Sequence, residues 1–151
     1  MARRRRRHGV SGTLGCERGQ ALVEAAIAIP VLLVLVFGVV AVGRVVRAKI
    51  AVQAAAREAG RTLAVAPSEH EGITDALVAA HAVAAGYGLS EERLTIDVDA
   101  NGFLRGGRAT ADVTYSVSLS GLPLLGFFDV EVSARHSEQI GPYRSREVVH
   151  R

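Results

Sequence analysis

Residues 18–44 read RGQALVEAAIAIPVLLVLVFGVVAVGR, and the uncharged stretch from Ala25 to Gly43 decides the fold class. This stretch holds about 19 residues, and a helix that rises about 1.5 Å per residue needs about 20 to cross the hydrocarbon core of a bilayer. Its composition is dominated by Val, Leu, Ile and Ala. The sequence therefore predicts a single-pass membrane protein whose spanning segment covers about residues 25–43.

The positive charge of the chain is concentrated in a leader, residues 1–19. The formal net charge is +3, but the leader holds the arginine block at residues 3–7 and Arg18 against the single acid Glu17, so the remainder is slightly acidic. Arginine-rich flanks stay on the cytoplasmic side of a membrane. We expect a cytoplasmic leader and an extracytoplasmic C-terminal domain. We expect no nucleic-acid partner, because the basic residues are explained by membrane topology.

Other targeting signals fit the N-terminal region less well. The apolar region of a secretory signal peptide is about 7–15 residues long, whereas this one is longer and is followed by the basic residues Arg44, Arg47 and Lys49. Cys16 is the only cysteine, so no disulfide can form within the chain. It is interpreted as an incidental cytoplasmic thiol, with acylation near the membrane as the alternative.

The helix that spans the membrane is expected to continue beyond it, over residues 20–66. Residues 44–65 contain no proline and many alanines, a composition with high helix propensity, and Pro67 ends the segment. Pro30 lies inside the membrane segment and lacks a backbone donor, so it should kink the helix and leave the carbonyl of Ala26 without its helical partner. Membrane helices tolerate such prolines, and a kink without a functional role is the alternative.

The remainder of the chain predicts one further helix and three strands. A short helix is expected over residues 73–85, with Thr74 or Gly72 as its cap. Apolar residues then alternate with polar ones, as in strands that have one wet face. The segments with this alternation are residues 94–99, 111–119 and 130–140.

The predicted fold class is α+β: a long N-terminal transmembrane helix that extends into a small antiparallel-sheet ectodomain with one further short helix. The expected domains are the leader (1–19), the long helix (20–66), an extracytoplasmic α+β domain (67–140) and a polar tail (141–151). A three-stranded sheet needs cover on its apolar face, so the long helix should pack there. Phe127 and Phe128 are expected to anchor that contact; alternatively, the segment stays exposed as a docking patch for a partner.

No catalytic or metal-binding pattern stands out. The five histidines are scattered, without metal-ligand spacing, and no glycine-rich phosphate loop follows a strand. The acids of the strand regions lie at alternate positions that are expected to face solvent. We therefore expect no enzymatic activity, no cofactor and no metal.

The segment from Gly19 to Glu24 resembles the processing signature of type IV prepilins, in which a basic leader ends in Gly and a Glu lies five residues into the mature helix. Together with the apolar run that ends at Arg44 and with QAAAREAGR at residues 53–61, it resembles the TadE-like family. These are small single-pass proteins of bacterial tight-adherence (Flp) pilus systems, described as pseudopilins or pilus-assembly proteins. The resemblance covers residues 18–66.

The resemblance implies cleavage after Gly19 by a membrane prepilin peptidase, which leaves Gln20 as the new N-terminus. It implies a pseudopilin-like subunit or assembly factor of a pilus or related secretion apparatus. The implied partners are the membrane, the peptidase, other pilus-assembly proteins, and a homo- or hetero-oligomer formed through the N-terminal helix. Ala25 occupies a position at which processed members tend to have an aromatic residue.

Glu24 is the candidate assembly residue, because an ionisable side chain at the edge of hydrocarbon is costly. Cleavage would place an α-amine on Gln20 one turn from Glu24, and the carboxylate of one chain can then pair with the amine of a neighbour. The alternative is that Glu24 lies in the headgroup region and interacts with the helix dipole. For the whole chain, the alternative is an uncleaved single-pass protein with a small binding or sensory domain.

Overall fold

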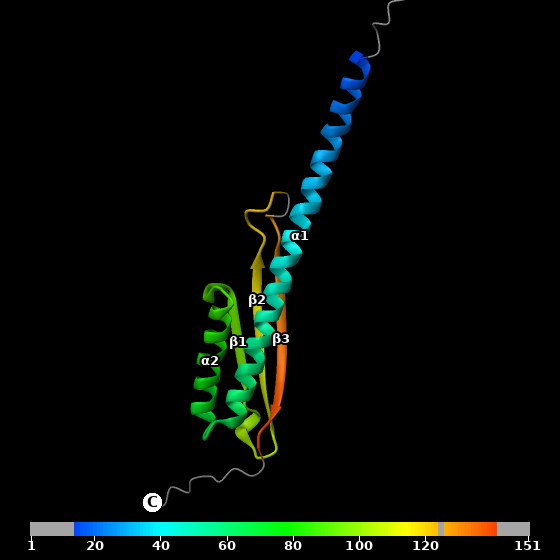
Figure 1. Ribbon diagram of the computed structural model, residues 1–151. Coiled ribbons are helices and arrows are strands. Elements are labelled where there is room, and N and C mark those ends of the chain that lie inside the picture. Colours follow the sequence, from blue (N-terminus) through cyan, green and yellow to red (C-terminus); the bar gives the residue numbers. More distant parts are fainter. Residues whose placement is uncertain (1–13, 124–125, 142–151) are drawn as a thin grey trace, which may run out of the picture. The chain divides into compact units, whose positions relative to one another are not determined.

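A computed structural model describes residues 14–123 and 126–141; the arginine block and nearly all of the polar tail lie outside these residues. The elements are two long helices, α1 (Leu14–Val65) and α2 (Glu69–Gly86), and three strands, β1 (Leu94–Asp99), β2 (Arg108–Ser118) and β3 (Asp129–Gln139) (Figure 1). Two short 3₁₀ turns, η1 (Glu91–Arg93) and η2 (Asn101–Phe103), flank β1. The predicted α+β architecture is confirmed. The chain divides into two compact units, residues 1–38 and 39–151, and the division falls within α1.

The first unit contains the N-terminal part of α1. This helix begins at Leu14, earlier than the expected start at Gln20, so residues 14–19 of the expected leader are helical. The reason is that Gly15 and Gly19 weaken a helix without breaking it. Every residue from Gly19 to Val36 is exposed. The helix is long and apolar enough to cross a membrane, as predicted.

The second unit is built on an antiparallel sheet with the strand order β1-β2-β3. The register pairs β1 with β2 and β2 with β3, so that residues 110–115 of the central strand have a partner on both sides, while the remaining residues of β2 pair with β3 alone. The row Ile96, Val113 and Ala134 lies on the apolar face, and the neighbouring row faces the opposite side and is charged. The alternation in the sequence therefore predicted the two faces of the sheet correctly.

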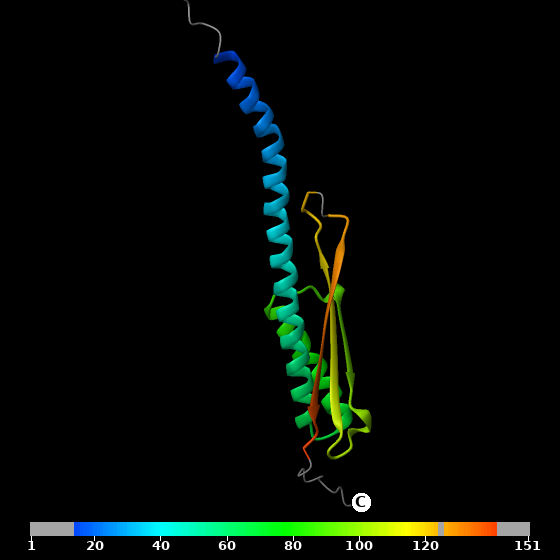
Figure 2. The ribbon, with the colours of Figure 1, turned by 90° about the vertical axis from the view of Figure 1, so that its right-hand side faces the viewer.

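The C-terminal part of α1 packs on the apolar face of this sheet. Figure 2 shows the helices of the second unit on one side and the three strands on the other. A Cβ added to Gly60 would lie 2.9 Å from Cδ2 of His136 on β3, so the helix and the strand approach closely at this glycine. The expectation that the long helix covers the sheet is confirmed. The helical side of the core consists mainly of small residues: Ala48, Ala51, Val52, Ala55, Ala56, Ala59 and Leu63.

The second helix starts earlier than predicted and has a different cap. It begins at Glu69, and the side chain of Ser68 accepts a hydrogen bond from the backbone N–H of Glu71 at 3.3 Å. Ser68 and Glu71 have the spacing of a capping box, which outweighs the weaker signals further along the chain. Thr74 instead donates to the carbonyl of His70 at 2.9 Å, and Gly72 is buried. The two caps suggested by the sequence were therefore wrong.

A stripe of small residues on α2 faces the core. Gly72, Ala76, Ala80 and Ala84 recur every fourth residue and are buried. A Cβ at Gly72 would lie only 2.6 Å from Cβ of Ala66, just beyond the end of α1. The two helices therefore meet closely at their junction because these positions lack large side chains.

The phenylalanines of the β2–β3 connection do not anchor the helix to the sheet. Phe127 is 91% exposed and Phe128 is 61% exposed. In the same connection Leu119 and Leu122 are buried, with exposures of 5% and 7%. The predicted anchoring role was wrong, because small side chains of α1 let it pack directly on the sheet and the leucines occupy the interior of the connection. The alternative, that the phenylalanines stay exposed, agrees with the structure.

Candidate functional site

The predicted processing and assembly residues all lie on the N-terminal part of α1. Gly19, Gln20 and Glu24 are exposed, and Gln20 and Glu24 are four residues apart on a continuous helix. Side chains at this spacing lie one above the other on the same helix face. The bond after Gly19 is therefore helical in the uncleaved chain, one turn from the carboxylate.

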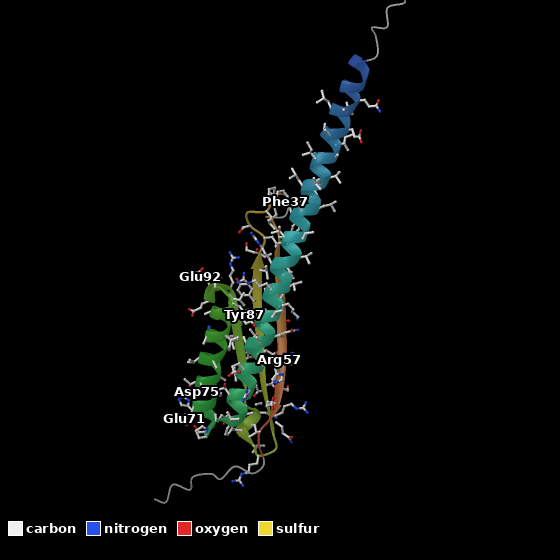
Figure 3. All side chains as sticks on the ribbon, in the orientation of Figure 1. Phe37, Arg57, Glu71, Asp75, Tyr87 and Glu92 are labelled. Atoms are coloured by element: carbon white, nitrogen blue, oxygen red, sulfur yellow. The ribbon has the colours of Figure 1, made fainter. Side chains whose placement is uncertain are left out.

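Glu24 is surrounded by an exposed apolar surface. Leu22 is 72% exposed, Val23 63% and Ile27 65%. Figure 3 shows the side chains of this segment pointing outward all around α1. Within the described residues, Glu24 makes no side-chain hydrogen bond or ion pair with another side chain. An apolar helix of this kind needs lipid or neighbouring helices around it. In either setting a cationic partner would stabilise the charged carboxylate of Glu24.

Pro30 lies inside α1, as the sequence indicated, and the helix continues on both sides of it. A proline at this position has no N–H, so it cannot donate to the carbonyl of Ala26. The predicted kink remains a prediction.

A basic hollow of about 330 Å³ lies between α1 and β3 in the second unit. The α1 side contributes Lys49, Gln53 and Arg57, which are spaced by four residues and follow one face of the helix. Figure 3 marks Arg57 on this part of α1. The side chain of Lys49 donates to the backbone carbonyl of Ser133. The sequence did not predict that β3 would complete a basic hollow beside this face of α1.

The β3 side of the hollow includes two further cationic or titratable side chains, each with an acidic neighbour. Arg135 forms an ion pair with Asp112, with Nε and Oδ1 2.6 Å apart, and this hydrogen bond raises the pKa of Arg135 above its usual value. His136 Nε2 lies 3.1 Å from Glu138 Oε2. Both pairs are on strands and partly or fully in contact with water, where such pairs contribute little to stability.

The described residues provide no metal centre. Among them no group of three His, Cys, Asp or Glu side chains is arranged to hold a metal ion. His81 on α2 has a buried Nδ1 without a hydrogen-bond partner in the described part of the chain. His136 belongs to β3 and bonds to Glu138. His81 and His136 thus lie on different elements of the second unit.

The comparison with protein families addresses the segment that carries the predicted site. The family model described as TadE-like protein matches residues 19–61. The resemblance to the TadE-like family is confirmed. The match begins at Gly19, includes Glu24 and Pro30, and ends within the part of α1 that packs on the sheet. No curated protein and no solved structure is significantly similar to the chain.

The TadE-like match gives a coarse functional assignment. It connects the chain with assembly of the tight-adherence pilus, and TadE-like proteins are pilus-associated structural proteins. Together with the long apolar helix near the N-terminus, it indicates a membrane protein. The matched residues contain the whole apolar run, whereas α2 and the sheet lie outside the match.

Proposed function

We propose that this TadE-like chain is a pseudopilin-like subunit or assembly factor of a tight-adherence pilus or related secretion apparatus. The observation that carries the proposal is the arrangement of Gly19 and Glu24 at the start of an exposed apolar helix. This arrangement combines a processing signature with a surface that requires lipid or other helices around it. The partners are the membrane, a prepilin peptidase and other pilus-assembly proteins.

Processing after Gly19 prepares the helix for assembly. The peptide bond to be cut lies within α1, so the peptidase must bind a locally unwound form of residues near Gly19. A glycine in a helix interior costs about 1 kcal/mol relative to alanine, and Gly15 and Gly19 therefore favour such unwinding. The cut removes the basic leader and exposes an α-amine on Gln20.

Glu24 fixes the register of the mature helix against its neighbours. Its carboxylate lies one helical turn from the new amine of the same chain. Between neighbouring chains, the carboxylate of one chain pairs with the amine of the next. An unpaired carboxylate at the edge of hydrocarbon is unfavourable, and pairing with the amine of a neighbouring chain removes that penalty. Each chain then offers one acceptor and one donor, as required for a repeating helical array.

The proposed topology has the leader in the cytoplasm and the part of the second unit that follows the apolar run outside. The arginine block at residues 3–7 exceeds the basic charge that follows the apolar run at Arg44, Arg47 and Lys49. The more basic flank stays in the cytoplasm. The sheet, α2 and the basic hollow are then available to envelope or pilus partners.

The test replaces Glu24 by Gln, which removes the charge and nearly preserves the volume. If Glu24 pairs with a neighbour in the membrane, loss of the pair costs about 3–5 kcal/mol, more than two decades in an assembly equilibrium. Insertion should remain intact, because an uncharged side chain enters the membrane more easily. The measurement is co-purification with other pilus components from the native host, together with piliation.

The matched control is Glu92→Gln, which removes the same charge from an exposed position in η1 of the second unit (labelled in Figure 3). We expect normal co-purification and piliation for this variant. Normal co-purification and piliation in Glu24→Gln would contradict the assembly role. The residue would then act at most on the helix dipole, an effect of less than about 1 kcal/mol.

A further inference from the structure

The described residues of the β2–β3 connection include two buried leucines and two exposed phenylalanines. Leu119 and Leu122 are buried, and Leu122 N–H donates to the carbonyl of Leu119 at 3.1 Å. Gly126 folds back over this turn, since a Cβ there would lie 3.3 Å from the carbonyl oxygen of Leu122. Phe127 and Phe128 follow immediately and are 91% and 61% exposed. Two adjacent aromatic rings beside a small apolar core form a surface that is unfavourable in water.

The loop lies beside the point where α1 ends its uncharged apolar run. Arg44, the first charged residue after that run, donates from Nη1 to the carbonyl of Ser120 at 3.3 Å. The last residues of the run, Val39 to Gly43, belong to the same compact unit as the loop. Val39 is 73% exposed and Val42 is 63% exposed. One end of the second unit therefore carries apolar side chains from both the helix and the loop.

We propose that Phe127 and Phe128 insert into the membrane interface next to α1, and that Arg44 and Arg47 bind the phosphates of anionic lipids around them. Aromatic side chains are favourable at the interface, and apolar groups of a peripheral segment bury a few ångströms into the boundary between headgroups and acyl chains. The loop thus gives the second unit a second contact with the bilayer. The inference rests on the membrane anchoring of α1 and does not depend on the pilus role.

The charges near the loop agree with a lipid partner. Arg44 and Arg47 each use one guanidinium contact, to the carbonyls of Ser120 and Tyr87, and a guanidinium has five N–H donors. Asp129 follows the phenylalanines and is the acid closest to them in the sequence. Basic side chains attract anionic headgroups over short distances. Two arginines and two exposed aromatics supply the basic and apolar groups through which interfacial segments bind anionic bilayers.

The chain contains no tryptophan, so a single introduced tryptophan gives an unambiguous fluorescence probe. We would reconstitute full-length Phe127→Trp into vesicles of phosphatidylethanolamine and phosphatidylglycerol, with Phe128→Trp as a second probe. The matched control is Leu104→Trp. Leu104 is 64% exposed in the β1–β2 connection, at the other end of β2. Since β2 runs from Arg108 to Ser118, the control probe lies about 30 Å or more from the loop.

Flotation of the vesicles first verifies that each chain is anchored. We expect the Trp emission at position 127 or 128 to be blue-shifted and to be quenched by lipids brominated near the top of the acyl chain. Aqueous iodide should quench this emission several-fold less than the emission of the probe at position 104. The inference is overturned, with the anchoring of α1 left intact, if the chain floats but two results are found. Iodide then quenches the probes at 127 and 128 as strongly as the probe at 104, and brominated lipid does not quench them. Protection from iodide that rises with protein concentration in detergent, without lipid quenching, assigns the surface to a second copy and also overturns it. A chain that does not float overturns both the anchoring and this inference.

Discussion

The junction of α1 and α2 makes a sharp prediction about Gly72. A Cβ at this position would lie 2.6 Å from Cβ of Ala66 and 3.0 Å from Cδ1 of Leu63. Neither neighbour can move freely, because Leu63 is completely buried and Ala66 directly precedes Pro67 in the connection between the helices. Gly72→Ala therefore forces the two helices apart by a fraction of an ångström to an ångström.

Two opposing effects determine how much Gly72→Ala changes the free energy of unfolding. Overpacking of a well-packed core typically costs about 1–3 kcal/mol. Replacing a helical glycine by alanine returns up to about 1 kcal/mol through helix propensity. The free energy of unfolding of the second unit should thus fall by about 1 kcal/mol in Gly72→Ala. In Gly86→Ala no atom lies within 4 Å of the new Cβ, so this control should be neutral or slightly stabilising.

Hydrogen exchange of the β2 amides in the full-length chain, reconstituted in lipid, measures this free energy. Central strands exchange through the most complete opening of a unit, and about 1 kcal/mol corresponds to a roughly fivefold change in the population of the open state. We expect β2 to exchange about fivefold faster in Gly72→Ala than in the unchanged chain. Equal exchange rates in Gly72→Ala and Gly86→Ala would refute the close contact of the two helices at this glycine.

Three further predictions concern processing, topology and the start of α2. Gly19→Ala should slow cleavage by a cognate prepilin peptidase, because it alters the residue before the cut and strengthens the helix that must unwind; mass spectrometry of co-expressed protein would follow the product that begins at Gln20. In spheroplasts that lack the peptidase, Cys16 should react with a membrane-impermeant thiol reagent only after permeabilisation, because the leader is cytoplasmic. Ser68→Ala should cost about 1 kcal/mol by removing the cap from Glu71 N–H, measured as faster exchange of the amides in the first turn of α2.

Each of these has an outcome that contradicts it. Recovery of only the full-length chain from the native host would rule out processing after Gly19. Labelling of Cys16 in intact spheroplasts would reverse the topology. Unchanged exchange in Ser68→Ala would show that Pro67 and the acidic first turn of α2 suffice to start the helix.

The large elements were predictable because each depends on a pattern within its own segment. A long uncharged run is sufficient to indicate a membrane helix, and the alternation at Leu94, Ile96 and Val98 is sufficient to indicate a strand with one wet face. The start of α2 was predictable in principle, since Ser68 and Glu71 have the spacing of a capping box and the Ser68 side chain accepts from the N–H of Glu71. These features require no knowledge of distant residues.

The errors and omissions concern contacts between elements. Phe127 and Phe128 are of a residue type that is usually buried, and only the folded chain shows that the core forms without their side chains. The approach of α1 to β3 at Gly60 and the basic hollow beside it depend on which strand lies next to the helix. The placement of Glu24 on the long helix followed from the sequence, whereas Gly19 was expected in the leader and lies inside α1. The roles of both residues in processing and assembly remain proposals.

The hydrogen bond from Lys49 to Ser133 has a consequence for protein crowding in the membrane. β3 is an edge strand, and the carbonyl of Ser133 points away from its partner β2. An open edge can recruit a strand from another chain, and this risk rises when many copies share one membrane surface. Lys49 occupies one of the free acceptors, while Glu131 and Arg135 place opposite charges on either side of it along the same strand. The edge is thereby protected against uncontrolled strand pairing. Contacts between chains must then form through surfaces other than this strand.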